Sequence, residues 1–150
     1  MNHHDHVNLI KNGLSKDGGT WADLGSGHGA FTLALAEVLG QNSTIYSIDK
    51  NSNALQQQVK QMKKQLPAVT THMISADFTL RLNLPMLDGI IMANSLHFIS
   101  DKLPLLEQLI TYLKPQGRLI LVEYNTNKGN RWVPYPLTYS HWEQLAQQAG

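Results

Sequence analysis

Short apolar runs alternate with longer amphipathic stretches along most of this 150-residue sequence. The apolar runs lie at residues 20–24, 44–48, 69–75, 89–93 and 118–123. The last of them, which contains Leu119-Ile120-Leu121-Val122, is apolar at consecutive positions and not at alternate ones. A strand needs such a run when both faces of its sheet are covered, as in a parallel sheet flanked by helices. The pattern therefore predicts an α/β fold built on a parallel sheet.

The amphipathic stretches carry the signals of crossover helices. One apolar stripe runs from Leu55 to Leu66 and stops before Pro67, and a second covers residues 103–113 and stops before Pro115. Ser140, three residues before Glu143, is typical of a capping box and predicts the start of a last helix. We expect that helix to bury four side chains, Trp142, Leu145, Ala146 and Ala149. The polar face of the glutamine-rich segment 56–65 is expected to be solvated.

Composition narrows the class of protein. Hydrophobic residues make up 42% and charged residues 15% of the chain, a balance that indicates one folded domain over residues 1–150. The net charge of +1 gives no reason to expect nucleic acid or a membrane as the partner. The chain has no cysteine and no apolar run of about 18 residues, so we expect a soluble, cytoplasmic protein. The start of the chain, with His3, His4 and His6, is expected to be unstructured and to hold no metal.

A glycine-rich turn follows the first apolar run directly. Its residues, Asp23-Leu24-Gly25-Ser26-Gly27-His28-Gly29, precede an apolar helical stretch. Glycines at such a turn let a ligand approach the backbone N–H groups at the start of a helix. Asp49 lies 20 residues after Gly29, at the end of the second run, where a carboxylate can accept the hydroxyl hydrogens of a ribose. The combination predicts a cofactor that carries a ribose.

Three carboxylates help to choose the cofactor. The spacing of Gly25, Gly27 and Ala30 also fits a nicotinamide dinucleotide. However, Asp23 would repel a pyrophosphate, and Asp23, Asp49 and Asp77 end three successive strands. A ligand with an ammonium group, a ribose and an adenine amine suits all three, and S-adenosylmethionine has these groups.

At these residues the chain resembles the class I S-adenosylmethionine-dependent methyltransferases, especially the small-molecule group that includes the quinone-biosynthesis C-methyltransferases. The resemblance covers residues 21–123 and, more weakly, the rest. It implies a Rossmann-like, doubly wound sheet of order 3-2-1-4-5, whose final antiparallel hairpin is missing here. It also implies a set of cofactor-binding residues: Asp23, Gly25, Ser26, Gly27, Gly29, Asp49, Lys50, Ala76, Asp77, Phe78, Asn94 and Ser95. In that set Asp23 would hold the amino group, Asp49 the ribose and Asp77 the adenine amine. Lys50 departs from the family, which usually has an apolar residue there.

Two further features concern the methyl acceptor. His97 follows the fourth run and is the candidate catalytic base, although a packed wall residue is the alternative. The connection over residues 124–139 carries Tyr124, Trp132 and Tyr135, which we expect to form a substrate wall or lid. The alternative is that these aromatics merely cover the sheet edge.

The leading interpretation is a methyltransferase for a small, partly apolar metabolite. A nicotinamide-dependent oxidoreductase and a non-catalytic cofactor-binding partner subunit are the alternatives. Without the hairpin, the apolar strand at 118–123 would be an open edge. We therefore expect a fragment of a longer domain or a homo-oligomer, unless the segment 124–139 covers this edge.

Overall fold

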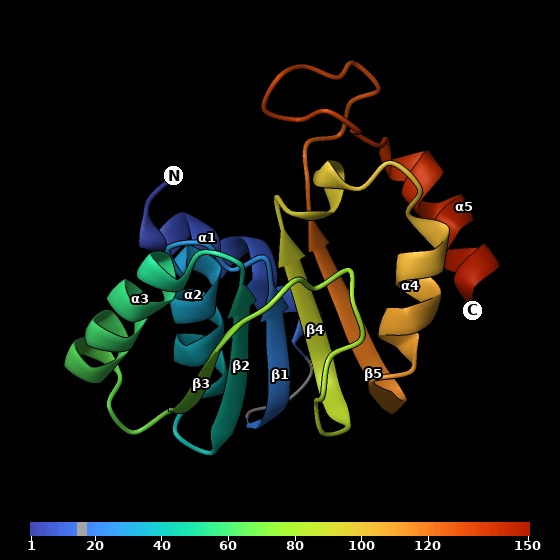
Figure 1. The fold of residues 1–150 in the computed structure, drawn as a ribbon. Helices are drawn as coiled ribbons and strands as arrows, with labels where there is room; N and C mark the ends of the chain where they lie inside the picture. Colours follow the sequence, from blue (N-terminus) through green and yellow to red (C-terminus); the bar gives the residue numbers. More distant parts are fainter. Residues whose placement is uncertain (15–17) are drawn as a thin grey trace.

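The computed structural model describes residues 1–14 and 18–150, and its centre is a parallel sheet (Figure 1). The strands of this sheet are β1 (Gly19–Leu24), β2 (Ser43–Asp49), β3 (Thr70–Ser75), β4 (Leu87–Ala93) and β5 (Leu113–Val122). Their order is β3-β2-β1-β4-β5, and every pair is parallel. The predicted fold class and strand order are confirmed.

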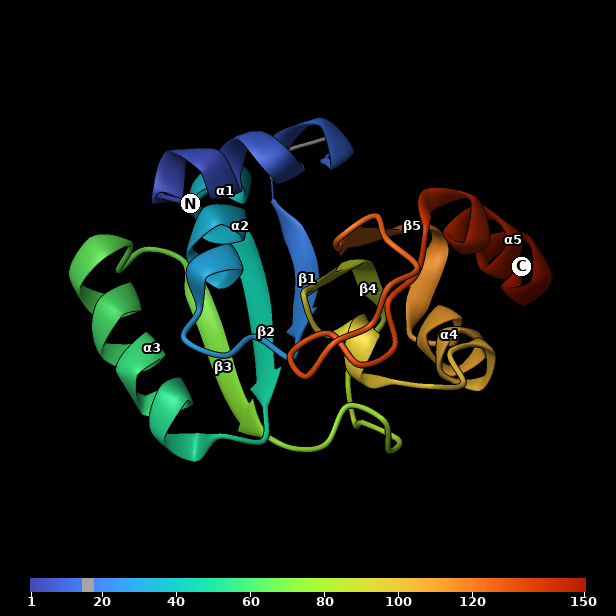
Figure 2. The same cartoon turned by 90° about the horizontal axis from the view of Figure 1, so that it is seen from above.

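Helices cover both faces of the sheet, which explains the apolar runs of its strands. One face carries α1 (His3–Ile10), α2 (Ala30–Leu39) and α3 (Ser52–Gln65), and the other carries α4 (Leu103–Ile110) and α5 (Tyr139–Ala149) (Figure 2). Side chains from β4 illustrate the division. Ile91 packs with the cluster under α1 and α2, whereas Ile90 and Met92 pack with the cluster under α4 and α5.

The end of α4 differs from the prediction. The helix stops at Ile110, and Leu113 already begins β5 opposite Leu87. The pairing shifts register between Leu87 and Gly89, which lets the strand continue through Pro115 at the edge of the sheet. Pairing with β4 therefore places Leu113 in a strand, although helical periodicity predicted that the helix would include it.

The start of α5 also differs. Its N-cap is Thr138, whose hydroxyl accepts the backbone N–H of His141 at 3.2 Å, so the predicted capping box at Ser140 is wrong. Leu145 is buried as expected, but Ala146 is exposed because the helix lies on α4 with a narrow face.

The start of the chain is a helix and not an unstructured terminus. Asn2 caps α1 through a capping box with Asp5, in which each side chain accepts the other residue's backbone N–H at 2.9 Å. Ile10 at the end of the helix is 1% exposed and belongs to the core beside α2. The pattern Asn-x-x-Asp before Val7 and Ile10 was a signal that could have predicted this helix. Within the described residues, no group of three or more metal-ligating side chains occurs.

Within residues 1–14 and 18–150, no strand pairs with the outer edge of β5. The segment after β5 rises above the carboxyl end of the sheet and does not run alongside the strand (Figure 1). A bridge joins Asn125 to Leu137 within the segment itself. The alternative that residues 124–139 cover this edge as a strand is therefore not seen in the described part of the chain, and the expected fragment or homo-oligomer stays a prediction. Among the described residues, no helix has the length and apolar character needed to span a membrane.

Replacing Ile10 by Ala tests whether α1 is an integral part of the core. The substitution leaves a cavity between α1 and α2, so we expect the free energy of unfolding to fall by about 2–5 kcal/mol in urea titrations. Leu9→Ala is the matched control, because Leu9 is 52% exposed. Equal, small effects of both substitutions would show that α1 does not stabilise the domain.

Candidate cofactor site

A cavity of about 290 Å³ lies at the carboxyl end of the sheet, where β1, β2, β3 and β4 end side by side. Most of the predicted cofactor-binding residues line it: Gly25, Asp49, Lys50, Ala76, Asp77, Phe78, Asn94 and Ser95. The sheet brings them together from segments up to about seventy positions apart because parallel strands place their carboxyl ends at one edge.

Three further lining residues, Thr79, Phe98 and Ile99, were not predicted. Thr79 donates both its backbone N–H and its hydroxyl to Asp77 Oδ1, at 2.9 and 2.7 Å. A Thr two residues after an Asp is a common turn signal, so this residue could have been found. Phe98 and Ile99 follow a short 3-10 turn, Leu96–Phe98, and no sequence pattern marks them.

Asp49 connects the glycine turn to the start of α3. Its Oδ2 accepts the Gly27 N–H and its Oδ1 accepts the Asn51 N–H, both at 2.8 Å. A carboxylate oxygen has two acceptor positions, so each of these oxygens can still accept one more hydrogen bond. Asp49 is therefore held in place and can still accept from a ligand's hydroxyls.

Asp77 is held as an anion at the cavity wall. The hydrogen bonds from the Thr79 hydroxyl and backbone lower the pKa of Asp77, and the charge of Lys50 adds to the effect. Lys50 Nζ lies 3.5 Å from Asp77 Oδ2. The residue that departs from the family pattern thus turns its charge toward this carboxylate.

Asp23 lies at the end of β1 under the glycine turn and does not line the cavity. Its Oδ2 accepts the Thr32 hydroxyl at 2.6 Å, and the residue is 1% exposed. Burial raises the pKa of Asp23 to about 7, although the Thr32 hydrogen bond opposes the shift. A cationic group near this carboxylate would favour its ionised form.

The three glycines of the turn serve different purposes. A Cβ on Gly25 would lie 2.6 Å from Ser95 Cβ, and one on Gly29 would lie 2.6 Å from Gln58 Cγ. A Cβ on Gly27 would meet nothing within 4 Å, although its φ of +57° favours glycine. A side chain at Gly25 or Gly29 would therefore collide with a neighbouring side chain, whereas one at Gly27 would enter open space. Ser26, in contrast, turns its hydroxyl inward, where Gln58 Nε2 donates to it at 3.0 Å.

His97 lies beside this cavity without lining it. Its Nδ1 is 2.8 Å from Glu123 Oε2, and its ring contacts the Phe98 ring edge-on with 4.4 Å between centroids. Burial raises the pKa of Glu123, whereas His97 and Lys102 lower it. The imidazole is 3% exposed, and among the described residues its Nε2 has no hydrogen-bond partner.

The three predicted substrate aromatics lie outside the cofactor cavity. Tyr124 and Trp132 line a second cavity of about 490 Å³ inside the connection after β5, and Tyr135 lines a third of about 400 Å³. All three side chains are exposed. The backbone of Tyr135 is nevertheless fixed, because its N–H donates to His97 O at 2.9 Å and its carbonyl accepts from Lys102 Nζ at 2.7 Å.

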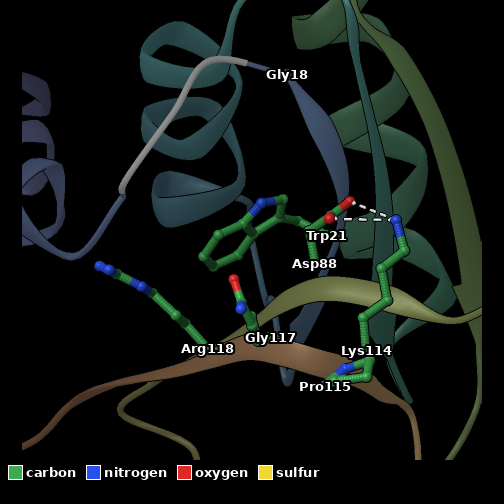
Figure 3. Close-up of a pocket in the computed structure, with 8 residues that line it drawn as sticks. Gly18, Trp21, Asp88, Lys114, Pro115, Gly117 and Arg118 are labelled. Carbon is green, nitrogen blue, oxygen red and sulfur yellow. Dashed lines mark hydrogen bonds and ion pairs between the residues drawn. The ribbon is translucent and has the colours of Figure 1, made fainter.

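A larger cavity, of about 720 Å³, lies near the amino ends of β1, β4 and β5, away from the glycine turn (Figure 3). Lys114 Nζ lies 3.2 Å from Asp88 there, and the Trp21 ring packs so closely on Gly89 that a Cβ would lie 2.3 Å from it. Ligands of open α/β sheets bind at the opposite, carboxyl edge, so the smaller cavity is the functional candidate.

Comparison with known proteins identifies the family. A family model described as a methyltransferase domain matches residues 15–149. The chain belongs to this family of methyltransferase domains. It is an S-adenosylmethionine-dependent methyltransferase, with S-adenosylmethionine as the methyl donor. The alternative interpretation, a nicotinamide-dependent oxidoreductase, is therefore wrong.

Solved structures share the fold. A SAM-dependent methyltransferase from Aquifex aeolicus is 24% identical with a TM-score of 0.78, and the match covers 97% of this chain and 79% of that one. Phosphoethanolamine N-methyltransferase 2 from Haemonchus contortus is 19% identical with a TM-score of 0.77, over 98% of this chain and 36% of that one. Mitomycin 7-O-methyltransferase is 14% identical with a TM-score of 0.77, over 97% and 47%. A search of curated proteins gave no match.

Replacing Gly27 by Val tests whether the open space beside the glycine turn belongs to the cofactor. The new side chain would occupy this space, so we expect the Kd for S-adenosylmethionine, measured by calorimetry, to rise at least about 100-fold. Gly40→Val is the control, because Gly40 also has a positive φ, +79°, and open space around its Cβ. Equal affinity in the two folded variants would place the cofactor elsewhere.

Proposed function

We propose that this domain transfers the methyl group of S-adenosylmethionine to a small, partly apolar metabolite. The observation that carries the proposal is the cavity at the carboxyl edge, which Gly25 of the glycine turn lines together with Asp49 and Asp77. The cofactor supplies an activated methyl group on a sulfonium. The residues of the chain bind and orient it and keep water away.

Each end of the cavity offers the chemistry that one part of the cofactor needs. Asp49 has acceptor positions left for two ribose hydroxyls, and Asp77 is held ionised beside Phe78, where an adenine amine and ring would fit. We assign the ammonium group to Asp23, which lies buried at the end of β1, just before the turn, and outside the cavity lining. Its raised pKa means that a bound cation would favour loss of its proton near neutral pH.

Methyl transfer is an in-line displacement, so alignment and exclusion of water supply much of the rate. The segment after β5 stands above the carboxyl edge (Figure 1). Its aromatic side chains Tyr124, Trp132 and Tyr135 are exposed. We assign these aromatics to the binding of the apolar part of the acceptor. A quinone-like ring is one acceptor of this kind, in keeping with the resemblance to quinone-biosynthesis enzymes.

His97 is the proposed base for an acceptor that must lose a proton. Glu123 accepts the hydrogen of Nδ1, which leaves the lone pair of Nε2 free to take a proton from a hydroxyl or an amine. Among the described residues, the other oxygen of Glu123, Oε1, is buried without a hydrogen-bond partner. If the domain were only a cofactor-binding partner subunit, this arrangement would have no acceptor to act on.

A labelled-methyl screen tests the proposed function. The protein is incubated with S-adenosylmethionine carrying a labelled methyl group and fractions of a metabolite extract, and transfer into a small molecule is measured. Asp49→Ala is the control: the loss of its charge-assisted hydrogen bonds should weaken cofactor binding by about 1.5 kcal/mol or more and reduce transfer at limiting cofactor. Cofactor binding without transfer to any fraction would support the partner-subunit alternative.

Replacing His97 by Gln tests the base. The amide keeps a polar group near Glu123 but takes up no proton, so we expect kcat to fall by about 100-fold while the Kd for the cofactor stays within twofold. An unchanged kcat would make His97 a packing residue that joins the turn after β4 to β5.

A further inference from the structure

Gln58 is a buried amide on α3 that contacts the glycine turn from below. It is 1% exposed, although it lies in the glutamine-rich segment that was expected to be solvated. Its position is three residues after Leu55 and four before Met62, so it lies on the same helical face as these buried side chains. A buried amide in an apolar face costs free energy unless its hydrogen bonds are satisfied.

All of those hydrogen bonds go to the glycine turn and to the strand beside it. Gln58 Nε2 donates to Gly27 O at 2.6 Å and to Ser26 Oγ at 3.0 Å, and its Oε1 accepts the Ser47 hydroxyl at 2.7 Å. The Ser47 hydroxyl also donates to Ser26 Oγ at 2.7 Å, so the two serines and the amide form one hydrogen-bonded cluster. Hydrogen bonds in such a cluster strengthen one another. The bond to Gly27 also assigns the orientation of the amide, since the reversed orientation would place Oε1 against the Gly27 carbonyl oxygen.

Gly27 is thereby fixed from both sides. Its carbonyl accepts from Gln58, and its N–H donates to Asp49, the residue assigned to the ribose. Glycine has wide conformational freedom, and no described heavy atom lies within 4 Å of the position that a Cβ on Gly27 would take, so side-chain packing does not restrict it. The side chain of Gln58 therefore supplies part of the order that a ligand would otherwise have to impose on binding.

From this geometry we infer that Gln58 is a positioning residue for the cofactor: it holds the Gly27 peptide in its binding orientation and thereby sets the affinity for S-adenosylmethionine. The inference deepens the proposed function, because it rests on the same cavity. Gln58 touches no reacting atom, so it should affect cofactor binding and not the methyl-transfer step itself.

The test compares three variants by calorimetric titration with S-adenosylmethionine, with no acceptor present. Gln58→Met keeps the length of the side chain and removes its hydrogen bonds, and we expect the Kd to rise about 10-fold or more. Gln58→Glu should raise the Kd further, because a carboxylate oxygen would face the Gly27 carbonyl. Gln56→Met is the matched control on the exposed side of α3 and should leave the Kd within twofold of wild type.

Thermal unfolding of the same variants without ligand separates positioning from stability. A Kd for Gln58→Met within twofold of wild type, in a folded protein, would overturn the inference and leave the proposed function intact. If Gln58→Met does not fold, Ser47→Ala removes the bonds of the Ser47 hydroxyl to Gln58 and to Ser26, and an unchanged Kd there would also overturn the inference. Once an acceptor is known, Gln58→Met should raise the KM for the cofactor and leave kcat within twofold. Wild-type binding without turnover would count against the proposed function alone.

Discussion

The site depends on how the chain turns between β1 and α2. Backbone groups at a sheet edge need partners, and a ligand site there must leave some of them accessible. In this protein the partners of Gly27 come from two other elements: Asp49 at the end of β2 and Gln58 in the middle of α3. The turn, β2 and α3 therefore form one hydrogen-bonded unit, and the cavity is shaped before any ligand enters it.

Two of the carboxylates along this edge, Asp77 and Asp23, differ in burial and in the direction of their pKa shifts. Asp77 is partly exposed and held ionised by Thr79 and Lys50, whereas Asp23 is buried with a pKa raised to about 7. Asp49 lies between them with both oxygens bound to backbone N–H groups. Three carboxylates on one edge would repel one another if all were fully ionised and close. Burial of Asp23 reduces this repulsion in the absence of a ligand, and a cationic ligand group would offset it when bound.

The acceptor end is constructed differently from the cofactor end. It is held by His97, Glu123 and Lys102, which tie the turn after β4 to β5 and to the segment that contains Tyr135. Desolvation lowers the pKa of Lys102 and raises that of Glu123, so each charge depends on the other's presence. The backbone of the segment after β5 is held at Tyr135 by its hydrogen bonds to His97 and Lys102. The side chains of Tyr124, Trp132 and Tyr135 are exposed.

Local pattern and spacing were sufficient for the sheet, its order and most of the cavity lining. Consecutive apolar residues identify a covered strand, and the parallel arrangement then places Asp49, Asp77 and Asn94 at one edge, whatever the details of packing. Local signals also existed for α1 and for Thr79, in the capping box of Asn2 with Asp5 and in the turn at Asp77, although neither was used.

Other features required the tertiary structure. Leu113 belongs to β5 because it pairs with Leu87 of β4. Gln58 is buried because α3 packs beside the glycine turn, where its amide donates to the Gly27 carbonyl. The partnership of His97 with Glu123 joins residues that are 26 positions apart. The sequence by itself determined the fold class and the residues at the sheet edge, because these follow from periodicity and strand direction. Only the tertiary structure decided which polar side chains are bound internally and which remain free for a ligand, because hydrogen-bond partners from distant segments are chosen by proximity in space.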